Sequence, residues 1–432
     1  MRPTSLLHPS LARQIAATIG TPAYVYSQPA LEQHAAAALA FPNAFGITVR
    51  FAMKALPNAA ILRLFHKLNL HFDASSTHEA YRAIRAGIPS AKISISTQEL
   101  SPDFIELLRM GVLVNACSLA QLAAIGQHFP GLQIGIRLNP GTGSGSTGKT
   151  NVGGPDASFG IWHEYLDDAI AIAHHNHLQI IRLHTHIGSG SDPLVWQHAA
   201  LQSLALVRRI PTIHTLNLGG GYKVARTESE HATDLQNVGT PIKTAIQDFA
   251  AQTNRQLHLE IEPGTFLTAN SGVILTRIQD ITDTGTHGRR FLKLDSGMTE
   301  LLRPPLYGAQ HPVEIVPATP SPTDTSAAST SCTRHPYIIV GHCCESGDLL
   351  TCAPGEPDTL APRELPIAHI GDLCLIGGAG AYCSSMSAKN YNSFPEAPEI
   401  LVTADNSALL IRRRQTLDQI VENEILPNPP PA

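Results

Sequence analysis

Short apolar runs separated by segments of helical period fill the chain from about residue 45 to residue 300. The clearest runs cover 47–53, 93–96, 132–138, 180–187, 216–218 and 257–262. Strands that alternate with helical segments of about 10–15 residues are typical of a parallel sheet, and this many repeats favour a closed (β/α)8 barrel. The pattern therefore predicts a barrel domain over residues 29–271.

A different pattern begins near residue 272, where short β-rich runs follow one another without helices between them. These runs cover 273–278, 291–294, 337–340 and 373–376. They predict a second, β-rich domain over 272–432. Residues 316–335, rich in Pro, Ser, Thr and Ala, are expected to form a mobile surface loop. Residues 410–424 have helical character.

Composition narrows the possible classes of protein. The 432 residues are 43% hydrophobic and 15% charged, which suits two globular domains. A net charge of -5 and a pI near 6.5 give no basic field for nucleic acid or an anionic membrane. We find no apolar run near the ~20 residues that would span a bilayer.

The cysteines and histidines indicate which cellular compartment to expect and whether the chain binds a metal ion. The seven cysteines lack zinc-ligand spacing, and the residues after Met1 do not resemble a signal peptide. We therefore expect a reducing compartment, the cytoplasm. Most of the 21 histidines stand in polar segments and are expected to be solvated, so no metal is implied.

Polar or glycine residues stand at or just after the ends of separate predicted strands. In (β/α)8 barrels the chemistry gathers at the C-terminal ends of the strands, so we expect these residues to share one site. They are Lys54, Asp73, Arg137, His186, Gly219-Gly220-Gly221 and Glu262.

Lys54 and Glu262 carry the most specific chemistry. Lys54 follows an apolar run, and partial desolvation of a lysine favours its nucleophilic form, as a Schiff base requires. A carboxylate such as Glu262 beside a pyridine nitrogen keeps that nitrogen protonated, so the ring can accept electrons. Taken alone, Lys54 could snorkel at a strand end, and Glu262-Pro263-Gly264 could be a surface turn.

Five segments together resemble one known family. They are Phe51-Ala52-Met53-Lys54-Ala55, His186-Ile187-Gly188-Ser189, Gly219-Gly220-Gly221, Glu262-Pro263-Gly264 and Cys344-Glu345-Ser346-Gly347-Asp348. They resemble the pyridoxal-phosphate decarboxylases with an alanine-racemase-like barrel, and among these the diaminopimelate decarboxylases. The resemblance covers nearly the whole chain. Alanine racemases of the same fold place an arginine where Glu262 stands, which favours the decarboxylase branch.

The resemblance implies pyridoxal 5'-phosphate as cofactor, bound as a Schiff base to Lys54. It implies that the imidazole of His186 stacks on the ring and that Glu262 contacts the pyridine nitrogen, favouring a quinonoid intermediate. Cofactor-binding roles are expected for Lys54, Asp73, Arg137, His186, Ser189, Gly219, Gly220, Gly221, Glu262, Gly264 and Tyr382. An isolated histidine is more often a core residue, and three glycines alone are a weak signal.

For the substrate, the resemblance implies meso-2,6-diaminopimelate, decarboxylated to L-lysine. Arg303 and Tyr307 are expected to hold its distal carboxylate and Glu345 its distal amino group, with Tyr382 nearby. Lys54, His186 and Cys344 are the expected catalytic residues, Cys344 returning a proton to Cα from the neighbouring subunit. A homodimer with shared sites is therefore expected, and residues 1–28, with the strand around Tyr24–Tyr26, are expected to join the β-rich domain.

Two departures from the family bear on the substrate. Thr265 stands where the family usually has an arginine, for which Lys149 or another loop cation is a candidate replacement. The glycine-rich loop 141–156 also differs. Two alternatives therefore stay open: the same chemistry on another diamino acid or carboxylated polyamine, and a non-catalytic homologue that binds the cofactor.

Residues 143–150 match the phosphate-loop pattern G-x-x-x-x-G-K-[ST], which raises a nucleotide-binding alternative. That pattern needs a helix that begins at Lys149. The helix-breaking residues 151–155 follow instead, which argues against a nucleotide site.

Overall fold

The computed structural model describes residues 7–144, 151–320 and 333–427. The chain divides into two compact units. Residues 29–270 form one unit, here the barrel unit, and the residues up to Gln28 together with those from Ser271 onward form the other, here the β unit.

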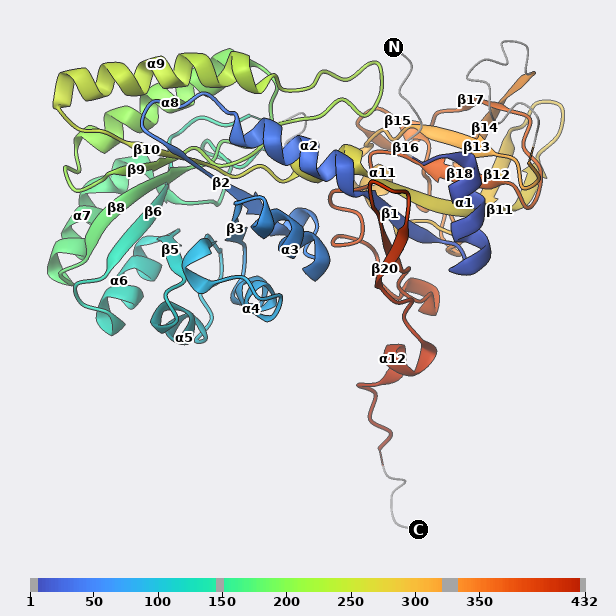
Figure 1. The fold of residues 1–432 in the computed structure, drawn as a ribbon, viewed down its shortest axis with the longest axis horizontal. Helices are drawn as coiled ribbons and strands as arrows, with labels where there is room; N and C mark the ends of the chain where they lie inside the picture. Colours follow the sequence, from blue (N-terminus) through green and yellow to red (C-terminus); the bar gives the residue numbers. More distant parts are fainter. Residues whose placement is uncertain (1–6, 145–150, 321–332, 428–432) are drawn as a thin grey trace. The chain divides into compact units, whose positions relative to one another are not determined.

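The barrel unit is built on eight parallel strands that close into a ring (Figure 1). Around the ring the order is β5-β4-β3-β2-β10-β9-β8-β6, and β6 pairs with β5 to complete it. This confirms the predicted (β/α)8 barrel. The strands are β2 (Ile47–Ala52), β3 (His71–Ala74), β4 (Ile93–Ile95), β5 (Leu113–Ala116), β6 (Gln133–Asn139), β8 (Gln179–Thr185), β9 (Thr215–Asn217) and β10 (His258–Ile261), with a short β7 (Ile161–Trp162) beside β6.

Helices cover the outside of the barrel (Figure 1). Several begin at polar N-cap residues shortly after a strand: Asn58, Ser76 and Ser118 each accept a hydrogen bond from a backbone N–H of the first turn. Each strand end is thereby fixed to the start of the next helix. The helices are α2 (Gln28–Leu39), α3 (Ala59–Lys67), α4 (Thr77–Arg85), α5 (Phe104–Arg109), α6 (Leu119–His128), α7 (Leu166–His175), α8 (Pro193–Arg208), α9 (Leu235–Thr253) and α10 (Thr265–Thr268).

Side chains along strand β2 alternate between an outer layer, under the helices, and the interior of the barrel. Phe51 points outward and packs edge-on against Phe65 of α3, with ring centroids 4.7 Å apart. Its neighbour Arg50 points to the inside, where it meets Glu260 of β10 at 2.7 Å. Because side chains alternate along a strand, one face builds an apolar layer under the helices and the other a polar barrel interior.

The β unit is a mainly antiparallel sheet ordered β17-β14-β12-β11-β1-β19-β20, with β18 paired to β11 and β13. Strand β1, which contains Tyr24–Tyr26, pairs with β11 and β19. The strands of this sheet are β1 (Ala23–Ser27), β11 (Gly272–Asp283), β12 (Arg290–Leu294), β13 (Val313–Val316), β14 (Arg334–Val340), β17 (Arg363–Pro366), β18 (Leu373–Ile376), β19 (Glu399–Val402) and β20 (Ala408–Arg412). Strands β15 (Cys352–Ala353) and β16 (Glu356–Leu360) pair separately with each other.

The described residues of the β unit form three α-helices: α1 (Pro9–Thr18), α11 (Arg303–Tyr307) and α12 (Leu417–Val421). Helix α1 lays Leu11 and Ile15 on the sheet, where they join a buried cluster with Val25, Leu275 and Ile400. The residues before the barrel therefore fold with the residues after it.

Two predictions for the β unit need correction. The helix expected over 410–424 is a strand up to Arg412, because β20 pairs with β19, and only 417–421 are helical. The expected loop 316–335 is shorter, since Val316 ends β13 and Arg334 begins β14. Its residues 321–332 lie outside the described part of the chain.

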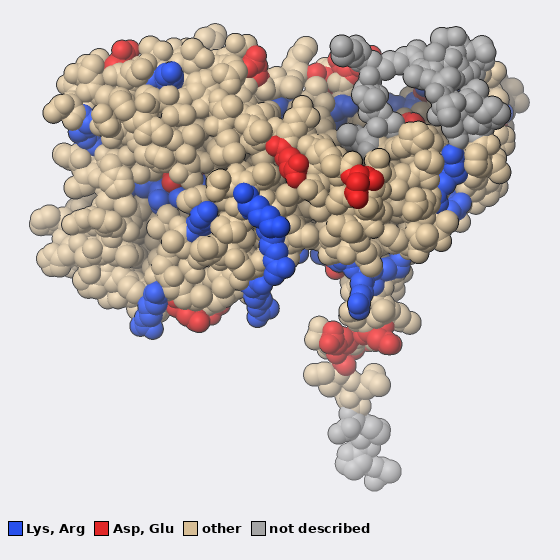
Figure 2. All heavy atoms as spheres, viewed as in Figure 1, with Lys and Arg blue, Asp and Glu red and all other residues tan. Residues whose placement is uncertain are grey.

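Charge is spread thinly over the surface. On the face shown in Figure 2, acidic and basic side chains are interspersed on both units. Within 7–144, 151–320 and 333–427 no helix is long and apolar enough to cross a membrane. The same residues contain no group of three or more His, Cys, Asp and Glu side chains placed to hold a metal ion.

Candidate active site

The C-terminal ends of the barrel strands carry the predicted cofactor-binding residues. Lys54 lies in the short 3-10 turn Met53–Ala55 directly after β2, and its side chain is exposed. Ala52 pairs with Asp73 of β3, so Lys54 and Asp73 end neighbouring strands. Asp73 is buried, and burial followed by the nearby charge of Glu262 raises its pKa, while Lys54 opposes the rise.

Glu262, just past β10, is a buried carboxylate with two fixed neighbours. Its Oε1 accepts a hydrogen bond of 2.7 Å from Nδ2 of Asn217, and its Oε2 lies 3.2 Å from Nε2 of His184. Burial opposes ionisation, but His184 and the Asn217 hydrogen bond hold the pKa of Glu262 well below its usual range. The contacts of Glu262 thus favour its ionised form.

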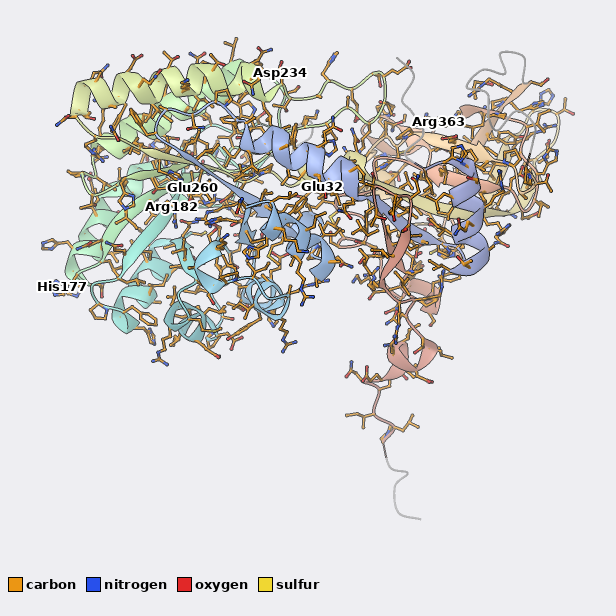
Figure 3. All side chains as sticks on the ribbon, in the orientation of Figure 1. Glu32, His177, Arg182, Asp234, Glu260 and Arg363 are labelled. Carbon is orange, nitrogen blue, oxygen red and sulfur yellow. The ribbon has the colours of Figure 1, made fainter. Side chains whose placement is uncertain are left out.

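A second carboxylate, Glu260, lies two residues before Glu262 and points to the same side of β10. Glu260 meets Nη2 of Arg50 at 2.7 Å and Nε of Arg182 at 3.1 Å, and all three side chains are buried. Figure 3 shows Arg182 and Glu260 close together inside the barrel. Burial again opposes ionisation, and the two arginines lower the pKa of Glu260 below its ordinary value.

His186 follows the end of β8. Burial lowers its pKa well below the ordinary value, and the charges of Arg137 and Lys54 lower it further. Its Nδ1 is buried and has no hydrogen-bond partner within the described residues. Arg137 of β6 is buried and lies over the ring of Phe159, 5.1 Å from its centroid. His186 is therefore a neutral ring close to two cations.

Two backbone segments come together beside these side chains. Gly190 N donates to Gly221 O at 3.1 Å, so the loop that contains Ser189 runs along the triple glycine. A Cβ on Gly221 would lie 1.7 Å from Gly188 O, and one on Gly219 would lie 2.7 Å from the Cβ of His186. Only glycine permits this approach, which leaves backbone N–H groups near the strand ends.

The segment after Glu262 is tied to the barrel by its backbone. Ala52 N donates to Pro263 O at 3.3 Å, which joins the ends of β2 and β10. Gly264 precedes α10, whose first residue is Thr265. The motif at 143–150 has residues 145–150, including Lys149, outside the described part of the chain.

The remaining predicted site residues belong to the β unit. Arg303 and Tyr307 begin and end α11, and the guanidinium carbon of Arg303 lies 5.9 Å from the centroid of the Tyr307 ring. Nε of Arg303 is buried without a hydrogen-bond partner in the described ranges. Tyr382 adopts a positive φ of 55° in the turn after β18.

Cys344 and Glu345 stand in a loop held by Asp348. The carboxylate of Asp348 accepts hydrogen bonds from Met298 N at 2.6 Å and from Cys343 N at 2.9 Å. Cys343 is buried and Cys344 is exposed. Burial, followed by the charge of Asp348, raises the pKa of Cys343 to about 12, so Cys344 is the accessible thiol of the pair.

Two hollows of the β unit meet at Glu345. One, of about 920 Å³, is lined by Cys344 and Glu345 with Phe291 and Phe394. The other, of about 550 Å³, brings Glu345 beside Leu302 and Leu306 of the α11 region. Neither hollow is lined by Arg303, Tyr307 or Tyr382.

The structure thus collects the predicted residues into two sets. Lys54, Asp73, His186, Glu262 and the triple glycine gather at one end of the barrel. The β unit holds Arg303 with Tyr307, and Cys344 with Glu345.

Sequence reasoning missed the polar side chains that surround Glu262. These are Arg50, Arg182, His184, Asn217 and Glu260. The signal was present as a period of two, since Glu260 precedes Glu262 and Arg182 precedes His184 by two residues on strands.

The barrel residues fit pyridoxal phosphate, the cofactor that the resemblance implies. A protonated pyridine nitrogen needs a buried, ionised carboxylate, which Glu262 provides. A flat ring can stack on a neutral histidine such as His186, and phosphate oxygens suit the N–H groups of glycine-rich backbone. Lys54 supplies the primary amine at the same end of the barrel.

Comparison with known proteins agrees with this chemistry. The family model described as "Pyridoxal-dependent decarboxylase, pyridoxal binding domain" matches residues 30–269. The diaminopimelate decarboxylase of Escherichia coli K12 is 33% identical over 98% of this chain and 98% of its own length. That of Streptomyces coelicolor is 33% identical over 99% of this chain and 94% of its own length.

Solved structures give the same picture. A crystal structure of diaminopimelate decarboxylase has a TM-score of 0.90 with 32% identity, and the match covers 98% of each chain. The Helicobacter pylori diaminopimelate decarboxylase, crystallised with L-lysine, has a TM-score of 0.82 with 27% identity over 95% of this chain and 98% of that one.

The family model covers more than half of the chain, and relatives that are one third identical match it from end to end. The chain therefore belongs to the pyridoxal-dependent decarboxylases, in the family that contains the diaminopimelate decarboxylases.

Proposed function

We propose that this chain decarboxylates meso-2,6-diaminopimelate to L-lysine and carbon dioxide with pyridoxal phosphate as cofactor. Its relatives over nearly the full length are diaminopimelate decarboxylases, and one of them binds L-lysine in the crystal. The observation that carries the proposal is the buried Glu262, ionised and fixed between Asn217 and His184 at the end of the barrel that bears Lys54.

Pyridoxal phosphate, when bound, supplies a ring that accepts the electron pair left at Cα when carbon dioxide departs. Glu262 is proposed to hold a proton on the pyridine nitrogen, which its lowered pKa suits. Lys54 is proposed to hold the cofactor through its amine. His186, uncharged because burial lowers its pKa, is proposed to stack on the ring.

The phosphate end is proposed to lie against the backbone N–H groups of Gly219, Gly220 and Gly221, with Ser189 and Gly264 nearby. The close approach of the 188–190 and 219–221 segments supports this assignment. Asp73 and Arg137 are proposed to set the charge around Lys54, since both lie within electrostatic reach of the site.

The β unit is proposed to supply the substrate contacts. Arg303 is proposed to bind the distal carboxylate with its guanidinium, which lies over the Tyr307 ring, and Tyr307 is proposed to add its hydroxyl. Glu345 is proposed to take the distal amino group, with Tyr382 near the cofactor. The exposed Cys344 is proposed to donate a proton to Cα, so that the carboxyl group lost as carbon dioxide is replaced by hydrogen.

We also propose a homodimer in which Cys344 serves the site of the neighbouring subunit. The exposure of Cys344 and Glu345 beside a hollow of about 920 Å³ supports a surface that another chain covers. Mixing Lys54→Ala with Cys344→Ala protein tests this. Shared sites would restore about one quarter of wild-type activity in the mixture, whereas separate sites would restore none.

The main test is an assay of purified protein with pyridoxal phosphate and meso-diaminopimelate, read as lysine and carbon dioxide formed. Wild-type protein should produce both, and Lys54→Ala should produce neither. Borohydride should fix the cofactor to Lys54 in the wild type. Absence of any bound cofactor would refute the proposal as a whole.

Thr265 makes the substrate the part most in need of measurement, because the family usually has an arginine there. Ornithine and a carboxylated polyamine should be assayed beside diaminopimelate. We expect kcat/KM to be highest for diaminopimelate, since Arg303 and Glu345 suit a distal group with both charges. A higher value for ornithine would move the assignment to another diamino acid.

For the compartment we propose the cytoplasm. The six cysteines of the described residues form no disulfide with one another, as is expected in a reducing environment. Fractionation of cells with an antibody to the chain tests this, and recovery from an oxidising compartment would contradict it.

A further inference from the structure

Asn217 is the side chain on which the contacts of the barrel site converge. It is the last residue of β9, fully buried, and stands two residues before the triple glycine. Its Nδ2 donates to Glu262 Oε1 at 2.7 Å and to Glu260 Oε2 at 3.2 Å. Its Oδ1 accepts from Gly219 N at 2.8 Å. One amide therefore touches both carboxylates and the first glycine.

These contacts leave the amide one orientation. A backbone N–H can only donate, so the atom that faces Gly219 must be the amide oxygen. A carboxylate can only accept, so the atom that faces Glu260 and Glu262 must be the amide nitrogen. The side chain cannot flip without placing like atoms together at both ends. Asn217 is thus a rigid connection between the glycines and Glu262.

The charges on either side explain why an amide is needed there. Glu260 is ionised because it contacts both Arg50 and Arg182. Glu262 must be ionised to act on a pyridine nitrogen. Two buried carboxylates that share a site disfavour each other's ionisation unless a donor lies between them. The two hydrogens of one NH2 group give each carboxylate a hydrogen bond.

We propose that Asn217 is a positioning residue that keeps Glu262 ionised and aimed at the pyridine nitrogen, and that joins this ring contact to the phosphate-binding glycines. The inference rests on the proposed function, because it takes Glu262 as the partner of the cofactor nitrogen. It adds that the protonation of that nitrogen depends on a residue that does not touch the ring.

The test replaces Asn217 by aspartate, which has the same size but a carboxylate where the NH2 group stood. Whether ionised or protonated, the aspartate offers Glu260 and Glu262 at most one hydrogen in place of two, so at least one of the two carboxylates loses its donor beside a third acidic group. We expect bound cofactor labelled with nitrogen-15 in the ring to be protonated in the wild type and largely unprotonated in Asn217→Asp, as read by nitrogen NMR.

Kinetics supply a second readout. We expect kcat for diaminopimelate to fall at least about tenfold in Asn217→Asp with little change in KM, because the electronic effect acts after substrate binding. Asn139→Asp is the matched control. Asn139 is 3% exposed and hydrogen-bonds backbone groups of Gly141, Gly154 and Ala157. It should keep the protonated nitrogen.

Asn217→Ser is the second variant in case the aspartate protein does not fold. It removes both amide hydrogens without adding a charge, and we expect the same loss of ring protonation in smaller degree. A protonated nitrogen in both folded variants, with wild-type kcat, would overturn the inference. A wild-type protein that binds cofactor with an unprotonated nitrogen, or binds none, would instead overturn the proposed function.

Discussion

Replacing Glu300 by glutamine should remove much of the pH dependence of the β unit's stability. The Glu300 side chain is 1% exposed, and burial raises its pKa from 4.5 to about 7. Ser296 Oγ, Thr299 Oγ1 and Gly297 N all donate to the same oxygen, Oε2, at 3.1, 2.7 and 3.3 Å. These hydrogen bonds lower the pKa again but do not cancel the effect of burial.

The sign of the effect follows from proton binding. The unfolded chain releases this proton near pH 4.5, and the folded chain keeps it until about pH 7. Between these values the folded state binds more protons, so the free energy of unfolding falls as pH rises. The contribution is fully present below about pH 4.5 and is lost as pH passes about 7. A shift of this size corresponds to about 3 kcal/mol.

The assay is urea unfolding of wild-type and Glu300→Gln protein at about pH 5 and about pH 8, followed by circular dichroism. Hydrogen exchange in β11 would assign the change to the β unit. Glutamine resembles the protonated acid and does not titrate. The free energy of unfolding of the variant, relative to that of the wild type, should therefore be about 2–3 kcal/mol higher at about pH 8 than at about pH 5. The exposed Glu314→Gln should show no such gain. If the free energies of unfolding of variant and wild type differ by the same amount at both pH values, the reasoning is refuted.

Three further results are expected. Glu260→Ala should lower the free energy of unfolding by about 3–5 kcal/mol in urea titrations, because it leaves two buried arginines unpaired; a loss below about 1 kcal/mol would contradict this. Gly221→Ala should weaken cofactor binding in fluorescence titrations, whereas Gly131→Ala, equally positive in φ but with open space around its Cβ, should leave it unchanged. Iodoacetamide should alkylate Cys344 before the five buried cysteines of the described residues, and mass spectrometry of peptides would reveal any other order.

The barrel could be predicted because its strands are short apolar runs at regular intervals. Six such runs became β2, β4, β6, β8, β9 and β10 with ends within two residues of those expected. Parallel strands in a barrel are buried on both faces, which gives them a strong apolar signal. Lys54 and Glu262 lie just past the ends of β2 and β10, as expected, whereas Arg137 lies within β6, two residues before its end.

Contacts between strands could not be predicted in the same way. Asn217 and Glu260 are 43 residues apart, and their hydrogen bond depends on β9 lying beside β10. The local sequence pattern predicts that a segment is a strand, but it does not predict which strand lies beside it. Residues 410–412 were predicted to be helical from their local sequence. They form a strand because β20 pairs with the edge of β19. Pairing with a neighbour overrides such weak local preferences.

The charges inside the barrel explain how a buried carboxylate can stay ionised at the centre of this fold. Arg50 and Arg182 neutralise Glu260, and Glu260 in turn shares the Asn217 amide with Glu262, which has His184 on its other side. Each of the two carboxylates thus has a cationic or hydrogen-bonding partner in direct contact, which offsets the cost of burying its charge.

This arrangement has a consequence for how substitutions act. A change at Arg50 or Arg182 removes one of the two cationic partners of Glu260, so the charge of Glu260, within reach of Glu262, is less well stabilised. On the proposed function, the expected effect on the cofactor nitrogen is electrostatic and needs no movement of the residues proposed to touch the ring. Activity in this chain should therefore be sensitive to the second layer of the barrel interior, where the side chains come from β2, β8, β9 and β10.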